Sequence, residues 1–229
     1  MSYISPSKIN TFFECPYKYY LSYVENLKPL YKPQYVFGSK VHEVIKRYYE
    51  LIPSSITASE VPMYVSVAWK EVFGDVTESA YRYMDGFVKF ESHRLSWNIN
   101  PKPLAIEKEF TRGPFKGVVD ALFRKGNEYI VVDWKTGMVK NPYEHQYLLV
   151  QGNIYMYLTS ASTCYFVFVG YGDWREVRYD KTFLDNIVEK FVSSVDRGLF
   201  NRNRGEWCKL CEFNVHCYLK EYNINWWEI

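Results

Sequence analysis

The sequence lacks any long apolar run, and its charges nearly cancel. The densest apolar stretch, Tyr165 to Val169, is far shorter than the roughly 20 residues needed to span a bilayer, and the N-terminus has no basic-then-apolar signal pattern. We therefore expect a cytoplasmic protein without a membrane segment. Lys and Arg number 28 against 26 Asp and Glu, which gives a net charge of +2. Bulk charge thus gives no sign of a nucleic-acid partner, and any basic surface has to be local.

Cysteine is also scarce, with five residues in a chain of 229. In a reducing compartment, five cysteines indicate metal binding or catalysis rather than disulfides. The length suits one large domain with a sizeable core, and 48% hydrophobic with 24% charged residues is ordinary for a globular protein. The aromatic content is high at 19%, including 22 tyrosines, which serve either packing or stacking against bases.

The hydrophobic pattern predicts an α/β fold. Ser5-Pro6 is typical of a helix start, with a capping hydroxyl and a proline in the first turn. We expect helices from Ser5-Pro6 to Cys15-Pro16, at 17–24, from Phe37, within 62–74 and 77–97, and at 143–158 and 182–195. We expect strands at 105–111, 115–123, 129–134, 163–170 and 175–179.

The stretch from Val131 to Gly137 ends a buried strand with two charges. Asp133 and Lys135 are two residues apart, so their side chains point to the same face of the strand. Desolvating two charges at the end of an apolar run is costly for folding alone, whereas a divalent metal and a phosphodiester would give the arrangement a purpose. Lys135 would then hold the attacking water or stabilise the developing charge. For so short a motif, an ordinary ion pair at a strand end is the alternative.

A second carboxylate, Asp120, lies on the preceding strand. If the turn between the strands places Phe123 opposite Glu128, then Asp133 lies opposite Val118. Asp120 is then its diagonal neighbour on the same face, roughly 7–8 Å away. That separation suits two carboxylates that share one magnesium or manganese ion, because both metals prefer hard oxygen ligands.

Further candidates lie on two expected helices. His42 is beside an apolar stripe, where a satisfied core or surface histidine is the alternative to a ligand. As a ligand, its nitrogen would favour manganese somewhat over magnesium. Gln151 and Tyr155 are four residues apart and share one helix face. Glu107 and Glu109 are accessory carboxylate candidates, with solvated or ion-paired glutamates as the alternative.

Together these residues resemble the PD-(D/E)XK nuclease superfamily. In this chain, Gly117-Val118-Val119-Asp120 followed by Asp133-Trp134-Lys135 resembles the core motif of that superfamily. Its RecB-like branch is similar to Gly38-x-x-x-His42, Asp133-x-Lys135-Thr136-Gly137 and Gln151-x-x-x-Tyr155.

The resemblance implies a restriction-endonuclease-like fold, in which helices flank a central mixed sheet. It also implies that His42, Asp120 and Asp133 bind the metal and that Lys135 is catalytic. The helix that carries Gln151 and Tyr155 would border the site and contact DNA.

The cysteines form a one-plus-three set. Cys15-Pro16 with Cys208-x-x-Cys211-x5-Cys217 resembles the iron–sulfur nucleases of the RecB-like branch. These include the CRISPR-associated nuclease that trims DNA before spacer acquisition, the AddB nuclease domain and the exonuclease V family. The resemblance implies that the four thiolates hold a 4Fe–4S cluster that joins the N- and C-terminal segments. By spacing alone, a structural zinc fits as well. Cys164, in an expected strand, is interpreted as a buried structural cysteine.

Taken with the resemblance, the sequence predicts a metal-dependent deoxyribonuclease in a single domain. Its parts are a helical N-terminal segment at 1–33, a nuclease core at 34–199 and a cysteine-rich segment at 200–229. The resemblance implies an exonuclease on single-stranded DNA, 5′-to-3′, with endonuclease activity also open. The implied setting is CRISPR spacer acquisition or DNA repair, with DNA, spacer-integration proteins and a second copy of the chain as candidate partners.

Two alternatives come from other classes of function. The first is a non-catalytic DNA-binding or assembly subunit that retains the fold and the cluster. The second is a zinc-stapled protein-interaction module.

Overall fold

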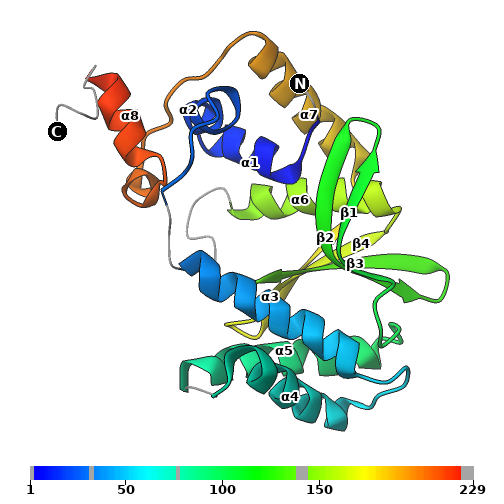
Figure 1. The fold of residues 1–229 in the computed structure, drawn as a ribbon. Helices are drawn as coiled ribbons and strands as arrows, with labels where there is room; N and C mark the ends of the chain where they lie inside the picture. The colour runs from blue at the N-terminus through cyan, green and yellow to red at the C-terminus, as the bar shows by residue number, and fades with distance from the viewer. Residues whose placement is uncertain (1–2, 31–33, 76–77, 138–143, 223–229) are drawn as a thin grey trace.

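The computed structural model describes residues 3–30, 34–75, 78–137 and 144–222 (Figure 1). At its centre is a five-stranded sheet whose strands lie side by side in chain order. β3 and β4 run parallel, and the other neighbouring pairs are antiparallel, so the sheet is mixed. The strands are β1 (Ala105–Arg112), β2 (Phe115–Lys125), β3 (Glu128–Lys135), β4 (Thr163–Phe168) and β5 (Asp173–Arg178).

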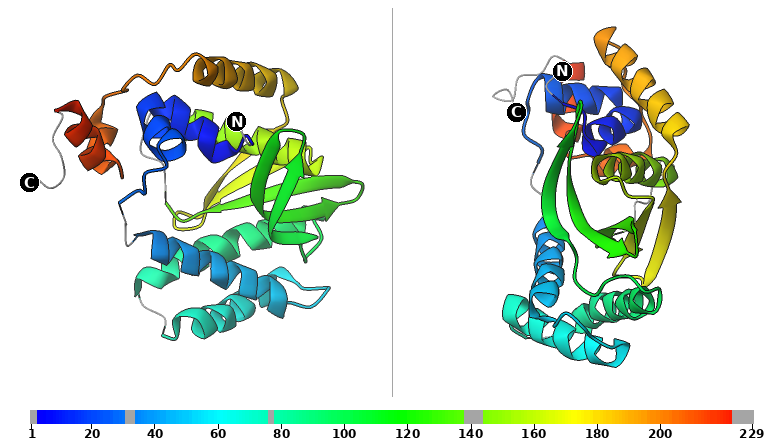
Figure 2. Two further views of the ribbon diagram at one scale, coloured as in Figure 1. Left: turned by 45° about the horizontal axis from the view of Figure 1, so that its top comes forward. Right: turned by 90° about the vertical axis from the view of Figure 1, so that its right-hand side faces the viewer.

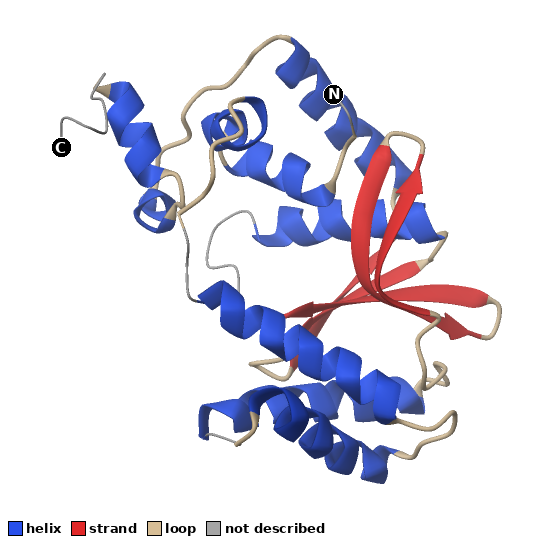
Figure 3. Ribbon diagram, in the orientation of Figure 1, coloured by secondary structure: helices blue, strands red, loops and turns tan. Residues whose placement is uncertain are grey.

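Helices cover both faces of this sheet. Their bounds are α1 (Pro6–Glu14), α2 (Pro16–Tyr19), the π-helical turn η1 (Tyr20–Val24), α3 (Gln34–Leu51), η2 (Ala58–Glu60), α4 (Val61–Phe73), α5 (Glu78–Ser96), α6 (Glu144–Thr159), α7 (Lys181–Asp196), η3 (Glu206–Leu210) and α8 (Asn214–Glu221). α1, α6 and α7 lie on one face, and α3, α4 and α5 lie on the other (Figure 2). The result is the helix-flanked mixed sheet that the sequence predicted (Figure 3).

The central strand β3 is buried on both faces. Val131 belongs to the hydrophobic core beneath α6, whereas Val132 belongs to the core beneath α3, α4 and α5. A strand covered on both sides is apolar at successive positions, which accounts for the continuous apolar run in this stretch of sequence. The charged residues at its end are therefore carried into the interior, and Asp133 is only 2% exposed.

Trp134 anchors the strand end that carries these charges. Its ring packs edge-on against Phe87 and Phe90, with centroid distances of 5.2 and 5.4 Å. Because side chains alternate along a strand, Asp133 and Lys135 point to the opposite face, toward α6. Buried aromatic packing on one face thus fixes the position of the two charges on the other.

The N-terminal segment is tied to the tip of the β1–β2 hairpin. The Ile4 N–H donates to the Pro114 carbonyl at 2.8 Å, and the Lys116 N–H donates to the Ile4 carbonyl at 2.9 Å. One residue later, the Ser5 side chain caps α1 by accepting a hydrogen bond of 3.3 Å from the Lys8 N–H. The first helix is therefore held against the sheet from its first turn.

The C-terminal segment returns to the N-terminal helices. The Leu30 N–H donates to the Glu212 carbonyl at 3.1 Å, and Lys220 of α8 forms an ion pair with Glu25, 195 positions earlier in the chain. Both views of Figure 2 place α8 beside the N-terminal helices. The two ends of the described chain thus build one region together.

The predicted helices and strands are confirmed, with ends that differ by a few residues. The segment at 17–24 divides into α2 and η1, and α8 was not predicted. Residues 31–33 of the predicted N-terminal segment, the helix starts predicted at 77 and 143, and the tail at 223–229 lie outside the described residues. Within the described part of the chain, no helix combines the length and the apolar character that crossing a membrane requires.

Candidate active site

Asp120 and Asp133 come from the neighbouring strands β2 and β3. The ladder between these strands ends at the pair Ala121–Val132, one step before the two carboxylates. Asp120 Oδ2 instead accepts a hydrogen bond of 2.9 Å from the backbone N–H of Trp134. The Asp120 side chain therefore accepts the next hydrogen bond after the backbone ladder ends. Both carboxylates lie at the point where the two strands separate.

The hairpin register differs from the one expected from the sequence, and that prediction was wrong. Phe123 pairs with Ile130 rather than with Glu128. The loop is only two residues long, and its Gly126 has a φ of +58°, a conformation that glycine adopts without strain. Since side chains alternate with a period of two, this two-residue shift keeps Asp120 on the predicted face. It makes the two carboxylates direct rather than diagonal neighbours.

Lys135 and Gln151 complete a hydrogen-bonded unit around Asp133. Lys135 Nζ lies 2.6 Å from Asp133 Oδ2 and donates to Gln151 Oε1 at 2.9 Å. Gln151 Nε2 donates to Asp133 Oδ1 at 2.8 Å and to the Tyr155 hydroxyl at 2.9 Å. Because an ammonium only donates and a carboxylate only accepts, this orientation of the amide is the one that satisfies both. The predicted residues of β3 and α6 are thus brought together.

His42 approaches the carboxylates from α3. Its Nδ1 lies 3.7 Å from Asp120 Oδ2. This approach depends on Gly38 one turn earlier, because a Cβ at that position would lie 3.0 Å from Thr136 Oγ1. Burial lowers the pKa of His42. The imidazole is therefore neutral at pH 7, which is the form that binds a metal.

Glu107 faces the same opening from β1. The register of β1 and β2 places Glu107 opposite Asp120. The residues on either side are paired in this register, but Glu107 and Asp120 themselves are not. The backbone of Glu107 has a φ of +44°, in the left-handed region that non-glycine residues rarely adopt. Its carboxylate forms an ion pair of 3.3 Å with Lys46 of α3. The sequence offered Glu107 only as an accessory candidate, and no sequence signal marked its strained backbone.

The charges in this site interact strongly. Burial raises the pKa of Asp120 well above its ordinary value, and the neighbouring charge of Asp133 raises it further. Burial opposes the charge of Lys135, but the two aspartates together raise its pKa above the usual value. When both carboxylates are ionised, the half-buried Asp120 and the buried Asp133 exceed the single ammonium of Lys135 by one negative charge, which a divalent cation would neutralise.

The donor chemistry of this site fits a hard divalent cation. Asp133 Oδ2 is buried, and its one close cation among the described ion pairs is Lys135 at 2.6 Å. Two carboxylates and an imidazole are ligands that manganese or magnesium takes. Over residues 3–30, 34–75, 78–137 and 144–222, however, no three His, Cys, Asp or Glu side chains are arranged as a metal-binding group. The ligand set of His42, Asp120 and Asp133 therefore stays a prediction.

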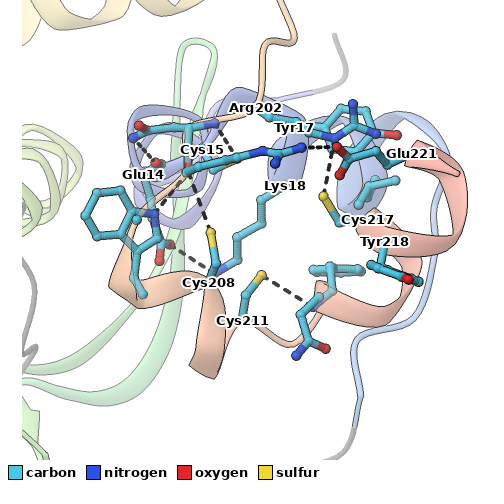
Figure 4. A pocket seen from close by; sticks show the side chains of 17 residues that line it. Glu14, Cys15, Tyr17, Lys18, Arg202, Cys208, Cys211, Cys217, Tyr218 and Glu221 are labelled. Atoms are coloured by element: carbon cyan, nitrogen blue, oxygen red, sulfur yellow. Dashed lines mark hydrogen bonds and ion pairs between the residues drawn. The ribbon is translucent and has the colours of Figure 1, made fainter.

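The four predicted cluster cysteines line one cavity of about 360 Å³ between the N-terminal helices and the C-terminal segment (Figure 4). Cys15 Sγ accepts a hydrogen bond of 3.4 Å from the Asn203 N–H, 188 positions later in the chain. In Figure 4, Lys18 extends among the sulfur atoms, and it is ion-paired with acidic residues on both segments. The sequence could not place this lysine. Cys15, Cys208, Cys211 and Cys217 thus line one cavity, but within the described part of the chain no three of them are arranged as a metal-binding group, and Cys164 is buried in β4.

The mixed sheet, with its acidic pair and lysine where β2 and β3 separate, is the arrangement of an α/β nuclease. The chain belongs to the PD-(D/E)XK nuclease superfamily, whose family model matches residues 3–218. Nucleases of this superfamily typically use magnesium or manganese. A search of the curated proteins finds no match.

The solved structures that are similar to this chain include the following two. A protein of Eubacterium rectale, described as a candidate exonuclease, is 12% identical, with a TM-score of 0.51 over 94% of this chain and 88% of that one. This likeness supports a shared fold and nothing finer. The crystal structure of SSO0001 is 17% identical over 79% of this chain and 95% of that one, with a TM-score of 0.36.

Proposed function

We propose that this chain is a metal-dependent deoxyribonuclease that hydrolyses phosphodiester bonds at the opening between β2 and β3. The observation that carries the proposal is the amide of Gln151, which joins both halves of the Asp133–Lys135 pair. An ion pair that served folding alone would need neither a second, half-buried carboxylate nor a histidine beside it.

The metal would be held by His42, Asp120 and Asp133. When bound, manganese or magnesium polarises the scissile phosphate and acidifies a water molecule. Asp120 has to ionise to serve as a ligand, which its raised pKa opposes until the cation arrives.

Lys135 acts as a fixed positive charge rather than as a base. Its raised pKa keeps it protonated at neutral pH. Of its three N–H groups, one is directed to Gln151 and one faces Asp133, which leaves one for a phosphate oxygen or a water. A preorganised donor of this kind stabilises the charge that develops on the phosphate in the transition state.

The substrate we propose is single-stranded DNA, degraded from an end as a 5′-to-3′ exonuclease, with endonuclease activity also open. The many aromatic side chains of the chain suit a single strand, whose bases are free to stack. Gln151 and Tyr155 border the site on α6 and are proposed to contact this strand.

We also propose that Cys15, Cys208, Cys211 and Cys217 hold a 4Fe–4S cluster. Their common cavity supports this assignment, because ligands from both ends of the chain have to converge for one cluster to form. The cluster would join the segments 1–33 and 200–229 across the core at 34–199, in a single domain. A structural zinc is the rival occupant.

The cellular setting follows only from the family resemblance. We propose a cytoplasmic nuclease in CRISPR spacer acquisition or DNA repair. Its candidate partners are DNA, the spacer-integration proteins and a second copy of the chain.

The second candidate is a non-catalytic DNA-binding or assembly subunit. The observation in its favour is that the described residues contain no group of three or more side chains arranged to hold a metal. Against it, the carboxylate pair, the lysine and the histidine are all present and close to one another.

Digestion of DNA labelled at its 5′ or 3′ end tests the proposal. Anaerobically purified protein is assayed with manganese, magnesium or chelator, on single- and double-stranded DNA. Asp133→Ala and Lys135→Ala should abolish cleavage, whereas Lys125→Ala, on the exposed far end of β2, should not. Cleavage that survives both active-site substitutions would sink the assignment. A folded wild type that binds DNA without cutting it would establish the second candidate.

A further inference from the structure

A pocket of about 510 Å³ adjoins the catalytic cluster on its N-terminal side. It lies between the segment around Tyr3 to Asn10 and the strands β1 and β2, and Gln151 and Tyr155 form part of its wall. The same two side chains are hydrogen-bonded to each other, and Gln151 contacts Asp133. The pocket is therefore continuous with the position at which the phosphodiester would be cut.

We propose that this pocket holds one unpaired nucleotide of the DNA strand, the unit next to the scissile phosphate. The inference rests on the function proposed above. The volume lies within the range of about 300–1,000 Å³ that small-molecule sites occupy, so it suits one nucleotide. A base inside such a pocket has left both its stack and its pairing partner. The substrate is thus single-stranded or frayed at the cleavage point.

Tyr3 supplies an aromatic surface for this base. The side chain is 38% exposed and lines the pocket. Lys8 holds this residue in place: its Nζ lies over the Tyr3 ring, 3.7 Å from the ring centroid, and donates to the Tyr3 carbonyl at 3.0 Å. Val118 of β2 also lines the pocket and is 48% exposed, which is unusual for valine in a strand. An aromatic ring and an exposed aliphatic side chain are surfaces on which a base or a sugar packs.

Lys116 supplies a cation for a neighbouring phosphate. It lines the pocket and is ion-paired with Glu109 at 2.8 Å. Its Nζ also lies 5.5 Å from the centroid of the Tyr3 ring. A phosphate at this position would compete with the Glu109 carboxylate for the ammonium. The pair therefore sets how tightly the strand is held.

Asn10 supplies a hydrogen-bond acceptor that lacks a donor. Its Nδ2 donates to the Tyr147 carbonyl at 3.3 Å, whereas its Oδ1 is buried without a partner among the described residues. Asn10 also lines the pocket. Unpaired buried acceptors are costly, and the amino group of a base or a sugar hydroxyl would satisfy this one.

Cleavage of oligonucleotides that each carry one abasic residue tests the assignment. An end label reports every cut, so the rate at each phosphodiester is read separately. For the wild type, the bond on one side of the abasic residue should be cut about tenfold more slowly than the same bond in the intact strand, because stacking on that base is lost. Tyr3→Ala should cut the intact strand more slowly and lose this local effect, whereas Tyr3→Phe should retain it. Tyr129→Ala, at an equally exposed tyrosine (39%) on β3, should behave as wild type.

Binding of the intact strand in chelator gives a readout that does not depend on chemistry. Lys116→Ala should weaken binding, and Glu109→Gln should tighten it several-fold by freeing the lysine. If the wild type cleaves DNA but the abasic residue has no local effect, or if Glu109→Gln weakens binding, the pocket assignment fails and the nuclease assignment stands. If the intact strand is neither bound nor cut, both assignments fail.

Discussion

Gln151 Nε2 lies 2.8 Å from Asp133 Oδ1, so an amide from α6 holds the carboxylate at the end of β3. The same side chain accepts a hydrogen bond from Lys135. Gln151→Ala should lower kcat about 10- to 100-fold, because hydrogen bonds to charged groups are worth about 1.5–3 kcal/mol. Single-turnover cleavage measures this. Gln146→Ala, on the same helix, is the control. An unchanged kcat in Gln151→Ala would show that the bridge does not position the site.

Asp120→Asn should change how the stability of the metal-free protein depends on pH. The pKa of Asp120 is raised in the folded state, mainly by burial and then by Asp133, so the folded protein binds this proton more tightly than the unfolded chain. The free energy of unfolding should therefore fall as the pH rises from about 4, by at most about 1.4 kcal/mol per unit. Lys135, Glu107 and His42 also act on Asp120.

Urea denaturation in chelator, at several pH values, measures this dependence. Asparagine keeps an oxygen for the Trp134 N–H but cannot ionise, so the variant should lack the wild type's decline. Its free energy of unfolding near pH 7 should exceed that of the wild type. Parallel pH profiles for the two proteins would refute the raised pKa.

Gly38→Ala should impair the site through one contact. The new methyl group would lie 3.0 Å from Thr136 Oγ1, closer than ordinary van der Waals contact, but 4.0 Å from Thr136 Cβ. We expect a loss of about 1–3 kcal/mol in stability and reduced cleavage, because overpacking displaces α3 and with it His42. Thr136→Ala in the same chain should restore most of the loss.

Gly137→Ala is the matched control for this pair, since no residue that the structure describes lies within 4 Å of a Cβ there. Thermal denaturation and cleavage rates of the single and double variants test the coupling. Purely additive effects of Gly38→Ala and Thr136→Ala would show that the two positions do not interact.

Iron content should separate the five cysteines into two groups. Alanine at Cys15, Cys208, Cys211 or Cys217 should remove the cluster and the absorbance of an anaerobic preparation near 400 nm. Cys164→Ala should retain both, because this thiol is buried in β4 and does not line the cavity. Metal analysis decides between the occupants: zinc in place of iron would overturn the cluster assignment.

The sequence predicted the elements better than their pairing. Helix and strand positions follow from periodicities that each segment carries by itself, as the Ser5 cap and the buried run of β3 show. The hairpin register depended on the conformation of Gly126, and spacing alone did not reveal a two-residue loop. The predicted register was wrong by two residues. Because this is an even number, the prediction still placed Asp120 on the correct face of the sheet.

The site residues could be predicted as a set, but their contacts could not. Order and spacing indicated that Gln151 borders the site, whereas its bonds to both charges of the strand end depend on how α6 crosses β3. The strained backbone of Glu107 lies where the ladder between β1 and β2 omits one pair, and it leaves no mark in the sequence. The pocket at Tyr3 is formed by the N-terminal segment and by strands more than a hundred residues later in the chain, so sequence spacing did not reveal it.

The cavity shared by Cys15 and Cys217 has a consequence for the timing of biogenesis. A ribosome releases the first cysteine long before the last one is synthesised, so the nuclease core can begin to fold while three of the four thiols are still missing. A cluster bound by all four can form only after synthesis of this region is complete. A bound cluster would then show that the segments carrying Cys15 and Cys217 have come together. A product truncated before Cys217 would lack the cluster.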